Sequence, residues 1–181
     1  MPVDEGEYRL QTTEGQAWEG EYRKRLAGAK NNDPQIAAQR SSLLSEAVSE
    51  ELKRITVLHG DAREKRKVVV HKGMEPPPPS DGINVWVRDG FSESENAIMQ
   101  DIQRRSVEDA AIHVLIPKVR TDDLKNALAS AIAADETINF KGSPTTEEGK
   151  EARASMVTRK SAEDRKVEDL AGEVLNGARV F

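Results

Sequence analysis

The sequence contains no cysteine among its 181 residues. Disulfide bonds, zinc sites built on thiolates and cysteine nucleophiles are therefore excluded. Aromatic residues make up only 4% of the chain. No apolar run approaches the roughly 18 residues that a membrane-spanning helix needs, and the first ten residues are acidic where a signal peptide would be basic and then apolar. We therefore expect a cytoplasmic protein that makes no membrane contact.

Charge is what the sequence has in abundance. Charged residues make up 33% of the chain and apolar residues 36%. This balance predicts a large hydrated surface, as in long amphipathic helices packed on a modest core. The net charge of −5 has the wrong sign for a general binder of nucleic acid or of anionic membranes. Local basic patches are still compatible with this net charge.

Two amphipathic patterns near the start of the chain predict helices. In residues 16–30 apolar side chains recur every three or four positions. A second pattern begins at Pro34, a residue suited to the first turn of a helix, and runs to about Gly60. Its apolar face comprises Ile36, Leu43, Ala47, Leu52, Ile55 and Leu58. The break between the two patterns is short, so we expect an antiparallel pair of helices.

The middle of the chain carries three strand signals. A β-branched run at residues 67–71 predicts the first strand, and residues 83–88 predict the second. Residues 111–116 are almost entirely apolar, as in a strand buried on both faces. Four consecutive prolines at 76–79 allow only an extended connector between the first two strands.

Further helices are expected between and after these strands. Ser92 followed by Glu95 is a capping-box pattern for a helix between the second and third strands. The order strand, helix, strand predicts a βαβ unit with parallel strands and a right-handed crossover. Thr121 can cap the next helix, and a last helix should run from Pro144 to about Asn176. Its apolar stripe is sparse and thins between Arg159 and Arg165, which is typical of a stretch that bridges solvent or awaits a partner helix.

Taken together, these patterns predict a helix-rich α/β fold. Its centre would be a small layered core of the βαβ type with about three strands, flanked by long amphipathic helices. We expect an N-terminal helical pair in residues 1–60 and a small α/β core in residues 61–142, which includes the proline-rich connector at 75–80. A long C-terminal helix in residues 143–181 would complete the chain.

No complete catalytic motif occurs in the sequence. Gly149-Lys150 is the only Gly-Lys pair, and Glu151 follows it where a phosphate-binding loop requires Ser or Thr. The glycine fingerprint of dinucleotide-binding folds and the Gly-x-Ser-x-Gly elbow of hydrolases are also missing. The three histidines are scattered without the spacing of a metal-ligand pair. We therefore expect no enzyme activity from this chain.

The most suggestive polar group follows the second predicted strand, at Asp89, Ser92 and Ser94. Ligands usually bind at the carboxyl ends of strands in α/β sheets. A carboxylate with two hydroxyls resembles the Asp-x-Ser-x-Ser adhesion motif that holds Mg²⁺, although here the serines lie one residue farther along. A tight turn followed by a helix cap explains the same residues. We favour the turn and cap, with the metal site as the alternative.

A basic segment lies around the first predicted strand. Its cations are Arg63, Lys65, Arg66, Lys67 and Lys72. Such a cluster could contact the phosphates of DNA. Asp61 and Glu64 dilute the charge, and no aromatic side chain is interleaved to stack on bases. We favour a solvated approach to the strand, with DNA contact as the alternative.

Three stretches of the sequence together resemble one protein family. They are EYRLQTTEGQAW at residues 7–18, VWVRDGFS at 85–92 and ETINFKGSPTTEEG at 136–149. In this order, the stretches are similar to the interior of the large P-loop ATPases of the BREX bacteriophage-resistance systems. Within the last stretch, residues 139–149 are the more distinctive. None of the three contains a nucleotide-binding motif, so no catalytic residue carries over.

The resemblance implies an interior fragment of a bacterial phage-defence ATPase that lacks the ATPase core. It implies ATP and Mg²⁺ for the full-length family and no cofactor for this fragment. The partners would be the remainder of the parent ATPase chain and other subunits of the defence system. We expect a non-catalytic interaction module that positions helical arms against these partners, with a DNA-contacting module using residues 63–72 as the alternative. A homodimer is also compatible with the sparse helical stripe.

Overall fold

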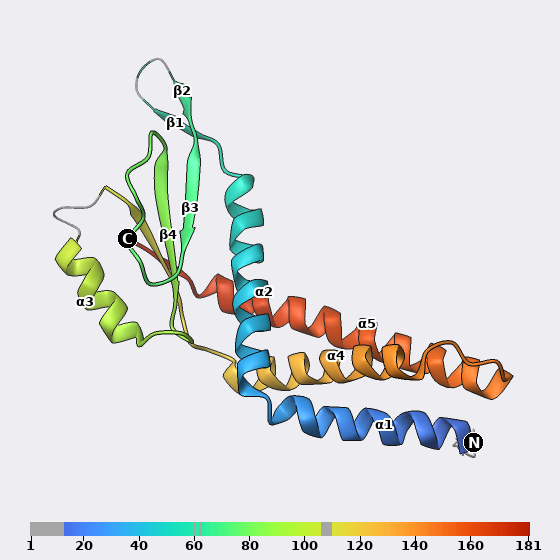
Figure 1. Ribbon diagram of the computed structural model, residues 1–181. Coiled ribbons are helices and arrows are strands. Elements are labelled where there is room, and N and C mark those ends of the chain that lie inside the picture. The colour runs from blue at the N-terminus through green and yellow to red at the C-terminus, as the bar shows by residue number, and fades with distance from the viewer. Residues whose placement is uncertain (1–12, 60, 62, 106–109) are drawn as a thin grey trace, which may run out of the picture. The chain divides into compact units, whose positions relative to one another are not determined.

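The computed structural model of the protein describes residues 13–59, 61, 63–105 and 110–181 (Figure 1). The helices are α1 (Thr13–Lys30), α2 (Asp33–Lys53), α3 (Glu95–Arg105), α4 (Thr121–Lys141) and α5 (Glu147–Asn176). The strands are β1 (Val57–His59), β2 (Glu64–Arg66), β3 (Val68–Lys72), β4 (Ile83–Asp89), β5 (Ile112–Ile116) and β6 (Arg179–Val180). This is a helix-rich α/β fold with a small mixed sheet, which confirms the expected fold class.

Packing divides the chain into two compact units. One unit, here called the helical unit, combines the described residues up to Ile36 with Lys125–Lys166. The other, here called the sheet unit, combines Ala37–Leu124 with Val167–Phe181. The chain-order segments expected from the sequence, with boundaries at about 60 and 142, differ from this division. Each unit has a core built from two segments that are far apart in the sequence, and local sequence patterns cannot show which segments pack together.

The core of the helical unit joins α1, α4 and α5. Trp18 and Tyr22 of α1 pack with Ala133 and Ala134 of α4 and with Met156 of α5. The small alanines let the helices approach closely, and the large rings of α1 fill the remaining space. The apolar stripe expected for α1 is therefore confirmed as a buried face. Its partners are α4 and α5, whereas the sequence predicts that α1 pairs with the second helix.

The connection between α4 and α5 is tight at Gly149. The Thr146 hydroxyl caps α5 by accepting a hydrogen bond of 3.1 Å from the Gly149 amide. A Cβ atom at position 149 would lie 2.6 Å from Cβ of Pro144 and 2.5 Å from a carboxylate oxygen of Glu14. Only glycine fits there without movement of its neighbours. This turn lies within the stretch that is most distinctive in the family resemblance.

The sheet of the sheet unit has the strand order β3-β4-β5-β6. β3 pairs with β4 and β4 pairs with β5 in parallel, and β6 pairs with β5 antiparallel. With α3 between β4 and β5, the expected βαβ unit with parallel strands is confirmed. The connector from β3 to β4 contains the prolines and has no helix, as expected.

The two faces of the sheet bury different helices (Figure 1). On one face, β4 and β5 contribute Val85, Val87, Val114 and Ile116, which pack with Leu44, Val48, Ala171 and Val174 of α2 and α5. On the other face, Leu115 packs with Ile98 and Ile102 of α3. This alternation follows from the period of two along each strand. Because β3, β4 and β5 are parallel, their carboxyl ends lie at the same end of the sheet.

The second helix is shorter than its amphipathic pattern predicts. α2 ends at Lys53, and Leu58 belongs to strand β1. Ile55 is 54% exposed and Leu58 is 46% exposed, so neither extends the buried face of the helix. The β-branched run that starts at Ile55 favours extended backbone and competes with helix propagation. Gly60, where the helix was expected to end, and residues 7–12 of the first family-like stretch lie outside the described residues.

The start of α3 differs from the expected capping box. The helix begins at Glu95, and its first turn is closed by the Ser94 carbonyl, which accepts a hydrogen bond of 3.0 Å from the Ile98 amide. The side chain of Glu95 does not reach back to Ser92. It accepts a 2.7 Å hydrogen bond from the Lys118 amide instead. A tertiary contact has thus replaced the local cap, because the end of β5 brings a backbone donor within reach.

The sequence signals also missed three short strands. β1 and β2 form an antiparallel hairpin, and β6 adds to the sheet edge formed by β5. Each has only two or three residues, which is too short for a periodic pattern. Among the residues that the structure describes, no helix is both long enough and apolar enough to span a membrane.

Candidate functional site

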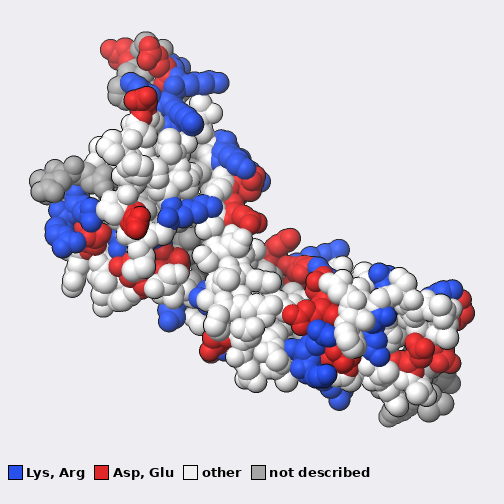
Figure 2. All heavy atoms as spheres, viewed as in Figure 1, with Lys and Arg blue, Asp and Glu red and all other residues white. Residues whose placement is uncertain are grey.

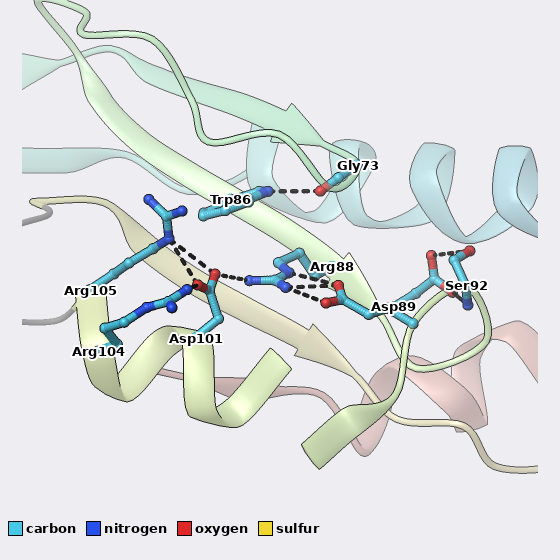
Figure 3. A network of polar contacts seen from close by, with 9 residues as sticks. Gly73, Trp86, Arg88, Asp89, Ser92, Asp101, Arg104 and Arg105 are labelled. Atoms are coloured by element: carbon cyan, nitrogen blue, oxygen red, sulfur yellow. Dashed lines mark hydrogen bonds and ion pairs between the residues drawn. The ribbon is translucent and has the colours of Figure 1, made fainter. Parts of the chain in front are cut away.

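Arg88 is a buried cation near the carboxyl end of β4. Its side chain is only 5% exposed and lies between two carboxylates (Figure 3). Its guanidinium donates to both oxygens of Glu93 at 2.8 and 2.7 Å and to Asp101 of α3 at 2.6 Å. A buried charge requires such pairing, because water is not there to solvate it. Arg88 therefore ties the loop after β4 and helix α3 to the sheet.

Asp101 is the centre of this charge network. It also accepts hydrogen bonds from Arg104 and Arg105, one turn farther along α3. Burial alone would raise the pKa of Asp101, but the hydrogen bonds from Arg104, Arg88 and Arg105 outweigh it and lower the pKa to about 2. Asp101 is therefore ionised at neutral pH. A carboxylate held in this way cannot act as a proton donor or acceptor near pH 7.

Trp86 lies on the same face of β4 as Arg88 and is 1% exposed. Its indole N–H donates a 2.8 Å hydrogen bond to the carbonyl of Gly73 (Figure 3). The guanidinium carbon of Arg88 lies 4.8 Å from the centre of the indole ring, and that of Arg105 lies 5.5 Å away. The ring thus packs beside two cations, as expected for cation–π contacts. The polar groups on this face serve to hold α3 and the β3–β4 connector.

The Asp89 and Ser92 side chains meet in a turn. Oδ1 of Asp89 accepts hydrogen bonds from the amides of Phe91 and Ser92 at 3.0 and 2.8 Å. Oδ2 accepts a 3.1 Å hydrogen bond from the Ser92 hydroxyl (Figure 3). This geometry matches an Asx turn, in which the carboxylate mimics a backbone acceptor. Ser94 is exposed and joins neither side chain, so the structure brings together two of the three candidate metal ligands.

A small cavity and a shallow depression lie near this turn. The cavity, of about 100 Å³, is lined by Ser41, Ser45, Lys72, Gly73, Met74, Arg88, Asp89, Ser92 and Glu93 together with the apolar side chains of Leu44, Val87 and Ile116. The depression is formed by residues 90–96 and Lys118. Within the described chain, no group of three or more His, Asp or Glu side chains is arranged to hold a metal ion. The carboxylates at this edge are already engaged by internal donors.

The described residues around Gly149-Lys150 do not fit the phosphates of ATP, which the family resemblance implies for the full-length protein. The amide of Gly149 is taken by the Thr146 hydroxyl, and the space beside Gly149 is filled by Pro144 and Glu14. A phosphate cradle needs such amides to point into open space. The Gly149-Lys150 pair is therefore part of a helix junction.

The basic segment runs along the β1–β2 hairpin and along β3. Arg63 precedes β2, Lys65 and Arg66 lie in β2, Lys67 follows it, and Lys72 ends β3. All five side chains are exposed, and none forms an ion pair with a described carboxylate. Figure 2 shows Lys and Arg side chains over the hairpin end of the sheet unit, with Asp and Glu side chains among them. Four of these cations therefore lie on or next to the hairpin, which is a separate two-stranded sheet, and Lys72 lies at the carboxyl end of β3.

β3 leaves one side of its backbone unpaired. The carbonyl of Lys67 accepts a 2.8 Å hydrogen bond from the Ile83 amide, which turns alternate residues of β3 toward β4. The N–H and C=O groups of Val68, Val70 and Lys72 therefore point away from the sheet. β3 is the first strand in the sheet order, and no described strand pairs with this side.

An apolar groove runs beside the unpaired edge. It has a volume of about 410 Å³. Leu52, Ile55, Val68 and Val70 line it, together with Ser49, Lys53 and Arg66. Val68 and Val70 are half-buried, so each still presents apolar surface. The groove combines an open strand edge, aliphatic walls and basic rims.

Sequence reasoning found the cations of this edge but missed the groove and the charge network. Arg88 was visible as a charged residue within a strand pattern, which is a signal for a buried ion pair. Its partners Glu93 and Asp101 had no such signal, because they lie on a loop and a helix. Comparison of the chain with protein-family models, curated proteins and solved structures found no match.

Proposed function

We propose that this chain is a non-catalytic interaction module of a larger cytoplasmic ATPase machine, resembling those of BREX phage defence. The observation that carries the proposal is the open edge of β3 with its apolar groove. Exposed strand edges invite pairing with another chain, and proteins use them to capture extended segments. The partner would be the remainder of the parent ATPase or another subunit of the defence system.

The charged groups near the carboxyl end of β4 support this proposal because they are already paired within the fold. Near the carboxyl end of β4, Arg88 pairs with both Glu93 and Asp101, and Asp89 closes a turn. These groups stabilise the fold and are engaged within it. In the described part of the chain, the outward backbone amides and carbonyls of Val68, Val70 and Lys72 have no strand partner, which suits a binding role.

The substitution Val70→Pro tests the proposal. The amide of Val70 points away from β4, so proline at this position removes an outward donor and leaves the β3–β4 ladder intact. The matched control is Val70→Ala, which shortens the same side chain and keeps the amide. We expect Val70→Pro, unlike Val70→Ala, to weaken assembly with the subunits encoded beside this chain by at least about tenfold, the order expected for loss of strand pairing.

Hydrogen exchange on the assembled complex gives a second readout. The amides of Val68, Val70 and Lys72 should exchange readily in the isolated chain and become protected in the complex. If these amides keep their exchange rates in the complex and Val70→Pro assembles like the wild type, the proposed docking function is wrong.

A DNA-contacting module is the second candidate, and the five exposed cations of the basic segment favour it. Phosphate contacts would make duplex binding fall steeply with salt. The double substitution Arg66→Glu/Lys67→Glu should then abolish binding. Duplex binding that survives this charge reversal would remove the segment from consideration as a DNA contact.

A further inference from the structure

We infer that the β3 edge selects an extended partner segment with acidic side chains at both ends and two aliphatic side chains between them, in the order acid-x-aliphatic-x-aliphatic-x-acid. This inference rests on the proposed docking function and specifies the chemistry of the partner. It follows from the order of side chains along one face of β3 and from the cations Arg66 and Lys72, which flank the two valines in that order.

The side chains along this face alternate in a fixed order. Arg66, Val68 and Val70 line the groove, so they share the face of the ribbon that is turned toward α2. Lys72 shares that face, because it lines the small cavity with Leu44 of α2. The face therefore reads basic, aliphatic, aliphatic, basic over seven positions. A strand added at this edge would place its own alternate side chains directly beside these four.

The aliphatic part of the motif follows from the walls of the groove. Leu52 and Ile55, on the side of α2, stand opposite Val68 and Val70. Ile55 is 54% exposed, which is a large apolar exposure for a residue beside a half-buried strand. Two aliphatic side chains in the groove would cover all four residues. The sheet already contains such an arrangement, because β4 places Ile83 and Val85 beside Val68 and Val70 on the paired side of β3.

The acidic part of the motif follows from charge. Arg66 and Lys72 flank the two valines, and neither has a described carboxylate as an ion-pair partner. Across positions 61–72 five cations stand against two carboxylates. A second copy of this chain would bring the same cations to the edge, so like charges would oppose its pairing. An acidic segment is the occupant whose charge complements the edge.

The motif reads the same in both directions, so it does not depend on whether the added strand is parallel or antiparallel. A synthetic probe can therefore be simple. The acidic probe is a fluorescein-labelled peptide with the core Glu-Thr-Val-Thr-Val-Thr-Glu, flanked by Gly and Ser. The basic probe replaces both Glu residues with Lys. Binding of each probe to the full chain is measured by fluorescence anisotropy at low salt.

The wild-type chain should bind the acidic probe about tenfold more tightly than the basic probe, the order expected for two cross-strand charge pairs. The variant Arg66→Glu/Lys72→Glu should reverse this preference. The control Arg63→Glu/Lys65→Glu carries the same change of net charge at positions outside the series Arg66, Val68, Val70 and Lys72, and it should keep the wild-type preference. Val70→Pro should bind neither probe.

Several results would overturn the inference. Equal affinity for the two probes, or a reversal caused equally by the control variant, would mean that general charge rather than the groove selects the peptide. Preferential binding of duplex DNA that Arg66→Glu removes would assign the edge to nucleic acid. A dimer that Val70→Pro dissociates would assign it to a second copy. If the acidic probe fails to bind while the β3 amides are protected in the natural complex, the partner chemistry is wrong and the docking function stands.

Discussion

The indole Nε1 of Trp86 donates a 2.8 Å hydrogen bond to the carbonyl oxygen of Gly73. This bond joins the centre of β4 to the first residue after β3. Gly73 begins the connector that carries the four prolines, and its φ of 104° is in the left-handed region that favours glycine. The contact therefore fixes the end of the same strand whose outer edge we propose as the docking surface.

The variant Trp86→Phe should lose about 1 kcal/mol through this hydrogen bond, in addition to the loss from the smaller ring. Trp18→Phe is the matched control, because Trp18 is also buried but lies in the helical unit. Urea unfolding of both variants, followed by circular dichroism, gives the comparison. In the absence of a partner, hydrogen exchange at Val69 and His71, whose amides face β4, should rise for Trp86→Phe only. A rise of equal size in Trp18→Phe would contradict a local role for the bond.

Arg88→Met should destabilise the protein by about 3–5 kcal/mol, because it leaves the carboxylates of Glu93 and Asp101 in place without their shared cation. The free energy of unfolding of Arg88→Lys should lie between those of the wild type and Arg88→Met, since an ammonium group cannot bridge both carboxylates in the same fork geometry. Arg23→Met is the control, as that side chain is 75% exposed and its ion pair should contribute less than about 1 kcal/mol. Denaturant titration of the wild type and the three variants gives the free energies of unfolding for this comparison. Similar losses for the Arg88→Met and Arg23→Met variants would refute the network.

The lowered pKa of Asp101 predicts a specific pH dependence. Its ordinary value is 3.8, and the folded protein holds it at about 2. The stabilisation is therefore fully present above about pH 4 and is lost as the pH falls toward 2. The shift corresponds to roughly 2 kcal/mol at neutral pH. Asp101→Asn should accordingly be less stable than the wild type at pH 7, and the difference should shrink below pH 4. A stability difference between Asp101→Asn and the wild type that stays constant from pH 7 to pH 2 would contradict this assignment.

Gly149→Ala should destabilise the helical unit by about 1–3 kcal/mol, since the new methyl group would overlap Cβ of Pro144. Gly20→Ala provides the opposite control. A Cβ at Gly20 in the middle of α1 meets nothing within 4 Å, so alanine should stabilise that helix by about 0.5–1 kcal/mol. Thermal unfolding of both variants tests the pair. A stabilising Gly149→Ala would show that the α4–α5 junction can relax.

Local patterns predicted most of the regular structure. The β-branched run gave β3, the apolar run gave β5, and the spacing of Trp18 and Tyr22 gave the buried face of α1. The failures have tertiary causes. Helix α2 is an example. The pattern placed Leu43 and Ala47 on its buried face, whereas the structure buries Leu44 and Val48. The sheet against which α2 packs decides how the helix is rotated about its own axis, and here the buried face is shifted by one residue.

The candidate sites were predicted in part. Asp89 and Ser92 do come together, and in the geometry of a turn. The basic segment was visible as charge alone, and its relation to a groove was not, because Leu52 and Ile55 reach it from an earlier part of the chain. Whether this segment binds a partner strand or DNA stays a prediction.

The sequence by itself determined the class of elements, the absence of thiol chemistry and the lack of a phosphate-binding loop. These depend on composition and on spacing over a few residues, which the chain carries locally. Only the tertiary structure decided that α1 packs with α4 and α5, that Arg88 is neutralised by Glu93 and Asp101, and that β3 stands at an open edge. Each of these depends on contacts between distant residues, whose free energy is set by shape and burial in three dimensions.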